Sequence, residues 1–285
     1  MNKKLFFSAC LLLLAAITPL KAQTEADSLA IVSAQWETTS PRKGIVQKCA
    51  AIPLLFDGPQ YISLIEIDPR QARVEAGIAI ADSMTQTSRI AKAHNAIAAI
   101  NGSYFDMKRG NSVCYLQAGE MVVDTTTASE FKLRVTGAIR VHKGKLEILP
   151  WSKPVEKNYK SRKGTVLASG PLMLKDGQTC DWSTCGQNFI KTQHPRSAVV
   201  TTRDGKVWLL TVDGRAPQHA QGMSIPQLAY LIRLLGGSDA LNLDGGGSTT
   251  LWHAGQVVNH PSDNKQFDHE GERRVPNIVY FTPKK

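Results

Sequence analysis

The segment from Asp244 to Thr249 places an acidic residue directly before three consecutive glycines, in the order Asp-Gly-Gly-Gly-Ser-Thr. Glycine loses more backbone entropy on folding than any other residue, so such a run needs a steric or functional reason. Backbone amides that approach a ligand closely and form an anion-binding concavity are one such reason. Asp244 is then a candidate acid or base. The candidate ligand-binding residues of the loop are Gly245, Gly246, Gly247, Ser248 and Thr249.

Known glycine-rich signatures do not account for this loop. No lysine follows the glycines, as a P-loop requires, and a strand rather than a helix is expected next, unlike the dinucleotide fingerprint. The Gly-x-Ser-x-Gly elbow of serine hydrolases does not occur either. A glycine-rich turn with a solvated aspartate is the alternative interpretation.

Four more polar segments stand beside predicted strands, where short loops are held rigidly. A histidine serves as acid, base or donor, a guanidinium matches phosphate oxygens, and an amide or carboxylate can fix hydroxyl groups. The candidates in these segments are Asn101, His194, Arg196, Asp213, Arg215, Arg273 and Arg274. Ordinary turns, a loop histidine and solvated surface charges are the alternatives.

The elements that must position these residues are mostly strands joined by short turns. Alternating apolar and polar residues flank Lys143-Gly144, Asp204-Gly205 and Gly255, and this pattern predicts three β-hairpins. Residues 61–68 are expected to form a further strand that stops before a proline.

Helices are few. Ser224 and Gln227 predict a capping box for a helix that Gly236 ends. Thr87 or Ser88 is expected to cap a shorter helix that runs to about residue 94. The sequence therefore predicts an α+β fold, a single domain with a large mixed or mainly antiparallel β-sheet and a few packed helices.

The chain is expected to start with an export signal over residues 1–22. Lys3 and Lys4 precede an apolar stretch too short for a membrane-spanning helix, and cleavage is expected after Ala22. Residues 23–50 are interpreted as a leader that packs only partly, and residues 51–285 as the domain. The mature chain is thus expected to be periplasmic or extracellular, without a transmembrane segment.

The formal net charge of +10 at pH 7 suits an anionic partner. No RNP-like, zinc-finger or helix-turn-helix pattern accompanies this charge, so nucleic acid is not expected as the partner. No cofactor is required by the sequence, and no dense ligand cluster supports a divalent metal. The oligomeric state is left open.

Four cysteines lie beyond the predicted signal, and in an exported protein they are disulfide candidates. They are Cys49, Cys114, Cys180 and Cys185. The sequence does not choose among their three pairings, one of which joins Cys180 to Cys185 and Cys49 to Cys114.

Six segments, taken in order, resemble the phosphodiester glycosidase domain family. They are Asn101–Phe105, Ser169–Pro171, His194–Arg196, Asp213–Arg215, Asp244–Thr249 and Arg273–Asn277. The resemblance covers about residues 61–281, and although no single segment is decisive, six in this order argue against chance. It implies a mixed α/β fold, an exported or luminal location and hydrolysis of a glycosyl phosphodiester, with a sugar similar to N-acetylglucosamine.

The resemblance suggests roles for the candidates. Arg196 and Arg273, with Arg274 as a substitute, are expected to bind phosphate together with the amides of residues 245–247. Asp244 is expected to act as base or nucleophile. His194 or Asp213 would assist proton transfer or hold sugar hydroxyls, and Asn101 would orient the phosphorylated or phosphodiester-linked glycan. The alternatives are a metal-dependent phosphodiesterase and a non-catalytic envelope protein that binds glycans or assembles exopolysaccharide.

Overall fold

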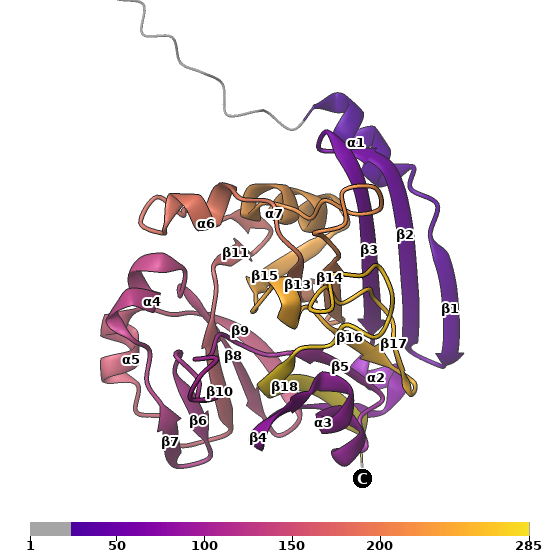
Figure 1. Cartoon of the computed structure of the whole chain (residues 1–285). Helices are drawn as coiled ribbons and strands as arrows, with labels where there is room; N and C mark the ends of the chain where they lie inside the picture. Colours follow the sequence, from indigo (N-terminus) through magenta and orange to yellow (C-terminus); the bar gives the residue numbers. More distant parts are fainter. Residues whose placement is uncertain (1–23, 285) are drawn as a thin grey trace, which may run out of the picture.

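The computed structural model describes residues 24–284, and antiparallel β-sheets dominate it (Figure 1). The largest sheet has the spatial order β1 (Glu37–Arg42), β2 (Ile45–Leu55), β3 (Gly58–Ile67), β14 (Val207–Val212), β13 (Arg196–Thr202), β15 (Gly237–Asn242), β11 (Leu172–Lys175) and β12 (Gln178–Thr179). The second has the order β7 (Met121–Asp124), β6 (Leu116–Ala118), β10 (Thr165–Ser169), β8 (Gly137–His142) and β9 (Lys145–Pro150). The third has the order β17 (Gln256–Val257), β16 (Leu251–His253), β5 (Ala98–Asn101), β18 (Arg274–Pro283) and β4 (Val74–Gln86).

Short helices connect and cover these sheets. They are α1 (Glu25–Val32), α2 (Pro69–Ala72), α3 (Thr87–Ala93), α4 (Ala128–Leu133), α5 (Lys153–Asn158), α6 (Gln187–Lys191), α7 (Ile225–Leu234) and the 3-10 turn η1 (Gly246–Ser248). Within residues 24–284, none of the helices has the length and apolar character needed to cross a membrane.

The predicted α+β fold is confirmed, although the strands divide into three sheets instead of one large sheet. The three predicted hairpins are present as β8–β9, β13–β14 and β16–β17, each with an antiparallel register. The strand expected over residues 61–68 is the second part of β3. The predicted export signal lies outside the described residues.

The helix α7 forms as its sequence predicts. The side chain of its N-cap Ser224 accepts a hydrogen bond from the Gln227 amide, and the Gln227 side chain accepts one from the Ser224 amide. Gly236 follows the helix at φ +99°. The apolar face of α7 packs against β15 and β11 (Figure 1). The start of α3 differs from the prediction, because Gln86 is its N-cap and no side chain caps it.

The amino-terminal leader packs more closely than the sequence suggests. Its predicted end at residue 50 falls inside β2, which pairs with β3 along most of its length. Ile31 and Ile45 are buried, because α1 and β2 contribute apolar side chains to the core. All residues of β1 are exposed at the edge of the sheet and Ile31 is the one buried residue of α1, so these two elements fit the expectation of partial packing.

Candidate active site

The antiparallel registers bring the polar segments to one end of the largest sheet. Arg196 at the start of β13 pairs with Val212 at the end of β14. On the other side of β13, Ala198 pairs with Asn242 at the end of β15. The segments that begin at His194, Asp213 and Asp244 therefore meet, as expected from their positions at strand ends.

Backbone contacts hold the glycine loop, here defined as residues 244–248, against two of the other segments. The Gly246 amide donates to the Pro195 carbonyl at 2.9 Å, and the Asp244 amide donates to the Gly102 carbonyl at 3.0 Å. A Cβ atom on Gly245 would lie 2.5 Å from the Pro195 oxygen, which is closer than real Cβ atoms approach. At least one of the three glycines is thus required by packing alone.

Asn101 is a positioning residue for this loop. Its side chain is fully buried, and its Nδ2 donates to the Asp244 carbonyl at 2.7 Å. Its Oδ1 accepts hydrogen bonds from the Ser197 hydroxyl and the Thr250 amide. Both ends of the amide are engaged within the protein, so the structure shows Asn101 holding the glycine loop, and its expected role in orienting the substrate stays a prediction.

The Asp244 carboxyl occupies a crowded environment at the head of the loop. Its Oδ1 accepts from the Gly245 amide at 3.0 Å. Burial raises its pKa above the usual range for aspartate, against the opposing effects of the Ser248 hydroxyl and the charges of Arg134 and Arg273. A carboxyl with a raised pKa is a stronger base near neutral pH, as proton transfer requires.

Two guanidinium groups flank the glycines. A Cβ atom on Gly246 would lie 2.8 Å from Nη2 of Arg215, and one on Gly247 would lie 2.4 Å from Nη2 of Arg273. Arg273 is fixed by Asp263, whose Oδ1 lies 2.9 Å from its Nε. The glycines therefore leave room for the Arg215 guanidinium and for the Arg273–Asp263 ion pair directly over the loop. Arg274, the predicted substitute for Arg273, is exposed at the start of β18.

The structure adds Arg134, which the sequence analysis missed. Glu130 binds its guanidinium with two hydrogen bonds, at 2.7 Å to Nε and 3.0 Å to Nη2. The guanidinium also lies 3.5 Å from the centroid of the Tyr104 ring and is close enough to Asp244 for their charges to interact. The only signal in the sequence was the spacing of Glu130 and Arg134, one helical turn apart.

Arg196 has a different role from the one predicted. Its side chain is 2% exposed, and its guanidinium donates to the carbonyls of Met223, Phe189 and Thr192. Burial, with a smaller effect of the Arg134 charge, lowers its pKa to about 10. These contacts join β13 to α6 and to the segment before α7, so Arg196 supports the site and does not line it as a phosphate ligand.

Asp213 also acts through a neighbour. It is 1% exposed, its Oδ2 lies 2.9 Å from Nδ1 of His260, and its Oδ1 accepts from Asn259 at 2.9 Å. Asn259 also donates to the Thr249 carbonyl, which connects this pair to the glycine loop. Asp213 is therefore a positioning residue, and the His260 ring that it holds becomes a candidate for proton transfer. His260 was missed because no motif surrounds it.

Aromatic side chains fix the His260 ring from several sides. Its centroid lies 3.9 Å from that of Phe267 and 4.4 Å from that of His269, both in stacked arrangements. Tyr61 meets it edge-on at 4.6 Å. Since Nδ1 faces Asp213, the nitrogen left for a ligand is Nε2.

His194 remains a candidate site residue because it lies near Arg215 at the edge of the glycine loop. Its backbone bridges to Met223, and its half-buried ring lies near Arg215. Burial lowers its pKa, and the charges of Arg196 and Arg215 add to the effect, so the imidazole is neutral at pH 7. A neutral imidazole beside Arg215 can accept or donate a hydrogen bond at the edge of the loop.

The four cysteines that were disulfide candidates are free thiols in the structure. Cys49 and Cys114 belong to different clusters of the core. Cys185 packs in the cluster beneath α7, whereas Cys180 packs against the cluster of Cys49. The structure therefore shows no disulfide bond among these four cysteines, and their pairing stays a prediction. Burial raises the pKa of all four thiols, that of Cys114 to about 12.

Comparisons with known proteins identify relatives of this chain. The chain is similar to the N-acetylglucosamine-1-phosphodiester alpha-N-acetylglucosaminidases of Mus musculus and Bos taurus, with 26% identity over 177 and 191 residues. These matches cover 58% and 63% of this chain but 33% and 35% of the relatives. The chain therefore spans about a third of the length of these curated relatives.

The fold is similar to that of a solved zebrafish protein, the N-acetylglucosamine-1-phosphodiester alpha-N-acetylglucosaminidase catalytic domain auto-inhibited by its pro-peptide. The TM-score is 0.65 at 18% identity, over 90% of this chain and 92% of that one. Residues 94–282 match the phosphodiester glycosidase family and contain all six motif segments. The chain belongs to the phosphodiester glycosidase family.

Proposed function

We propose that the protein is a hydrolase that releases a sugar from a glycosyl phosphodiester. The observation that carries this proposal is the glycine loop, where Arg215 and Arg273 lie over the glycines and the raised pKa of Asp244 marks a carboxyl suited to proton transfer. The activity after which the mammalian relatives are named supports N-acetylglucosamine as the sugar. The amino-terminal apolar segment supports action outside the cytoplasm.

The loop is suited to bind the phosphate group of such a substrate. Guanidinium groups match phosphate oxygens with paired hydrogen bonds, and backbone amides of glycines add donors that need no side chain. We assign Arg215, Arg273 and the amides of residues 245–247 to this role. Arg134 balances the charge of Asp244 beside them. Fixed positive groups of this kind also stabilise the phosphate monoester as it departs.

Hydrolysis then requires little covalent chemistry from the protein. Water attacks the anomeric carbon, the bond from that carbon to the phosphate oxygen breaks, and the phosphate monoester leaves with the bonding electrons. We assign Asp244 as the base that takes the proton from the attacking water. His260, held by Asp213, is the second group placed to exchange a proton with a sugar hydroxyl or with the departing oxygen.

The test is hydrolysis of N-acetylglucosamine-1-phospho-6-mannose in water enriched in ¹⁸O. Glycosidase cleavage gives mannose 6-phosphate and N-acetylglucosamine with the label on the sugar, and Asp244→Asn should lower the rate by about 10²–10⁴-fold. Label in the phosphate, with N-acetylglucosamine 1-phosphate as product, would mean phosphodiesterase cleavage and overturn the proposal. Absence of turnover on this and other glycosyl phosphodiesters would favour a glycan-binding protein instead.

A further inference from the structure

A groove runs beside the active site, across one face of β1, β2 and β3. Glu37 pairs with Cys49, Thr39 with Gln47, and Ala51 with Tyr61 in the sheet register. Side chains of paired residues lie on the same face of a sheet. Along each strand, successive side chains point to opposite faces, so every second residue lies on the same face. The residues named here therefore form one continuous wall. We call the groove that this wall lines the Tyr61 groove.

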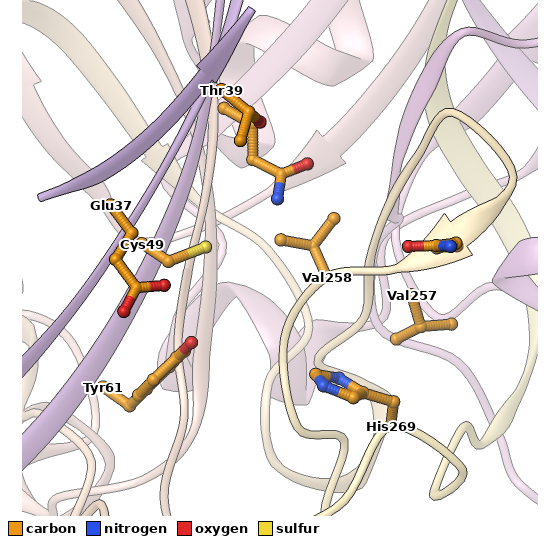
Figure 2. Close-up of a pocket in the computed structure, with 9 residues that line it drawn as sticks. Glu37, Thr39, Cys49, Tyr61, Val257, Val258 and His269 are labelled. Carbon is orange, nitrogen blue, oxygen red and sulfur yellow. The ribbon is translucent and has the colours of Figure 1, made fainter. Parts of the chain in front are cut away.

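Two adjoining cavities make up this groove. One has a volume of about 220 Å³ and the other about 290 Å³, and both are lined by Glu37, Cys49 and Tyr61. Figure 2 shows the first, with Glu37, Cys49 and Tyr61 facing Val257, Val258 and His269 across an open space. Each cavity alone is slightly smaller than the range of about 300–1,000 Å³ that small-molecule sites occupy, so each has room for part of a ligand such as one sugar residue.

The Tyr61 groove adjoins the catalytic groups. Tyr61 and His269, which line it, are two of the residues that contact the ring of His260, at 4.6 Å and 4.4 Å between ring centroids. Burial is the largest of several effects that raise the pKa of the Tyr61 phenol to about 12. The charge of Asp213 is another of these effects, so the phenol lies close enough to Asp213 for the two groups to interact. A ligand in the groove would therefore meet His260 at one end.

The lining has the chemistry of a sugar site. Tyr61 offers an aromatic surface for stacking, while Thr39, Gln47 and Gln256 offer hydrogen-bonding groups for hydroxyls. Gln47 is held by His253, whose Nδ1 lies 2.8 Å from its Oε1. An anion is disfavoured, because the Glu37 carboxylate lines both cavities and no lysine or arginine lines either one.

The distribution of charge therefore separates two parts of a ligand. Arg215 and Arg273 lie over the glycine loop, whereas the Tyr61 groove carries Glu37. We propose that the Tyr61 groove is a subsite for an uncharged sugar residue, next to the phosphate site at the glycine loop. That this sugar belongs to the hydrolysed substrate rests on the proposed function, but its binding in the groove does not.

The experiment measures binding by the whole mature chain, with calorimetry and saturation-transfer NMR. The neutral probes are chitobiose and mannobiose, and the charged probe is mannose 6-phosphate. We expect a neutral disaccharide to bind, with about tenfold weaker affinity in Glu37→Ala and in Gln256→Ala, since each removes a hydrogen bond to the ligand. The matched control is Glu120→Ala in an exposed turn, which should bind as the wild type does.

Mannose 6-phosphate separates the two sites. Its affinity should be unchanged in the groove variants and lowered in Arg215→Ala. The inference is overturned if neither disaccharide binds, or if both groove variants bind them as tightly as the Glu120→Ala control. Disaccharide binding that weakens in the groove variants, without any hydrolysis, would contradict the proposed function and support the subsite. Hydrolysis without disaccharide binding would support the proposed function and contradict the subsite.

Discussion

Asp213 Oδ2 lies 2.9 Å from His260 Nδ1, and the aspartate is almost completely shielded from solvent while the histidine side chain is 12% exposed. A buried carboxylate on one ring nitrogen fixes the tautomer and orientation of an imidazole, so that the other nitrogen is presented in a defined state. The two residues are 47 positions apart in the sequence and meet only through the fold.

If His260 transfers a proton, its removal should be chemically reversible. We expect His260→Ala to lower kcat by about 10²-fold or more, because general acid–base groups contribute at least that much. Added imidazole should restore part of the activity of this variant, which it would not do for a purely structural loss. His219→Ala is the control, since that ring also stacks on Phe267. Equal losses in both variants, without rescue, would contradict the assignment.

The raised pKa of Asp244 has a consequence for stability. A carboxyl that binds its proton more tightly in the folded chain stabilises the fold at low pH, and this contribution is lost as the pH rises through the raised pKa. Asp244→Asn is neutral at every pH. The Tm of this variant relative to wild type should therefore increase between pH 4 and pH 8, while its activity is lost.

Asp106→Asn provides a control of the opposite sign. The backbone amides of Arg109 and Lys108 lower the pKa of this exposed carboxyl, so its small stabilising effect is present at neutral pH and lost on acidification. Differential scanning calorimetry across the pH range measures both variants. A constant Tm difference for Asp244→Asn would argue against the raised pKa.

Replacement of a glycine in the glycine loop should distinguish the cost of backbone strain from an effect on substrate binding. Gly246 has φ +61° with Arg215 beside it, and Gly119 has φ +59° with open space around it. Alanine at either position costs about 1 kcal/mol of backbone strain. Only Gly246→Ala should also raise KM, by about tenfold or more, because its methyl group displaces the Arg215 guanidinium. Unfolding curves and steady-state kinetics for the pair check this, and similar KM values would remove Arg215 from the phosphate site.

Two arginines near the site, Arg196 and Arg134, should differ in what they affect. Arg196→Met leaves buried carbonyls without donors and is expected to destabilise the fold by about 1–3 kcal/mol, with KM little changed in the folded fraction. Arg134→Met should lower activity strongly, because it leaves Asp244 without its balancing charge, and it should also destabilise the fold, because the buried Glu130 carboxylate loses two hydrogen bonds. Urea denaturation combined with kinetics distinguishes them, and a reversed pattern would exchange their roles.

Much of the architecture follows from local patterns. The turns at Lys143-Gly144 and Asp204-Gly205 and the capping box at Ser224 each depend on neighbouring residues, and each formed as predicted. The glycine loop was also recognisable, because Gly245 and Gly246 make close approaches that few other residues tolerate. Features of this kind are encoded within a few positions of the chain.

Burial and long-range partners could not be predicted in the same way. Arg196 and Asn101 have the right residue types for ligand binding, but tertiary packing engages them within the protein. Conversely, Arg134 and His260 lie in segments without any motif and reach the site through the paths of α4 and of the loop after β17. The type of a side chain indicates which chemistry it can perform, but only the packed structure determines whether it is free to perform it.

The wall of the Tyr61 groove comes from an early part of the chain. Glu37, Gln47 and Tyr61 all precede residue 94, where the match to the family begins, whereas Arg215, the glycine loop and Arg273 lie inside it. Part of the ligand preference is thus encoded outside the stretch that carries bond cleavage, while the facing residues Gln256 and His269 lie inside that stretch. Exchange of the β1–β3 hairpins between relatives is therefore a direct route to enzymes with new glycan selectivity that keep the same hydrolytic centre.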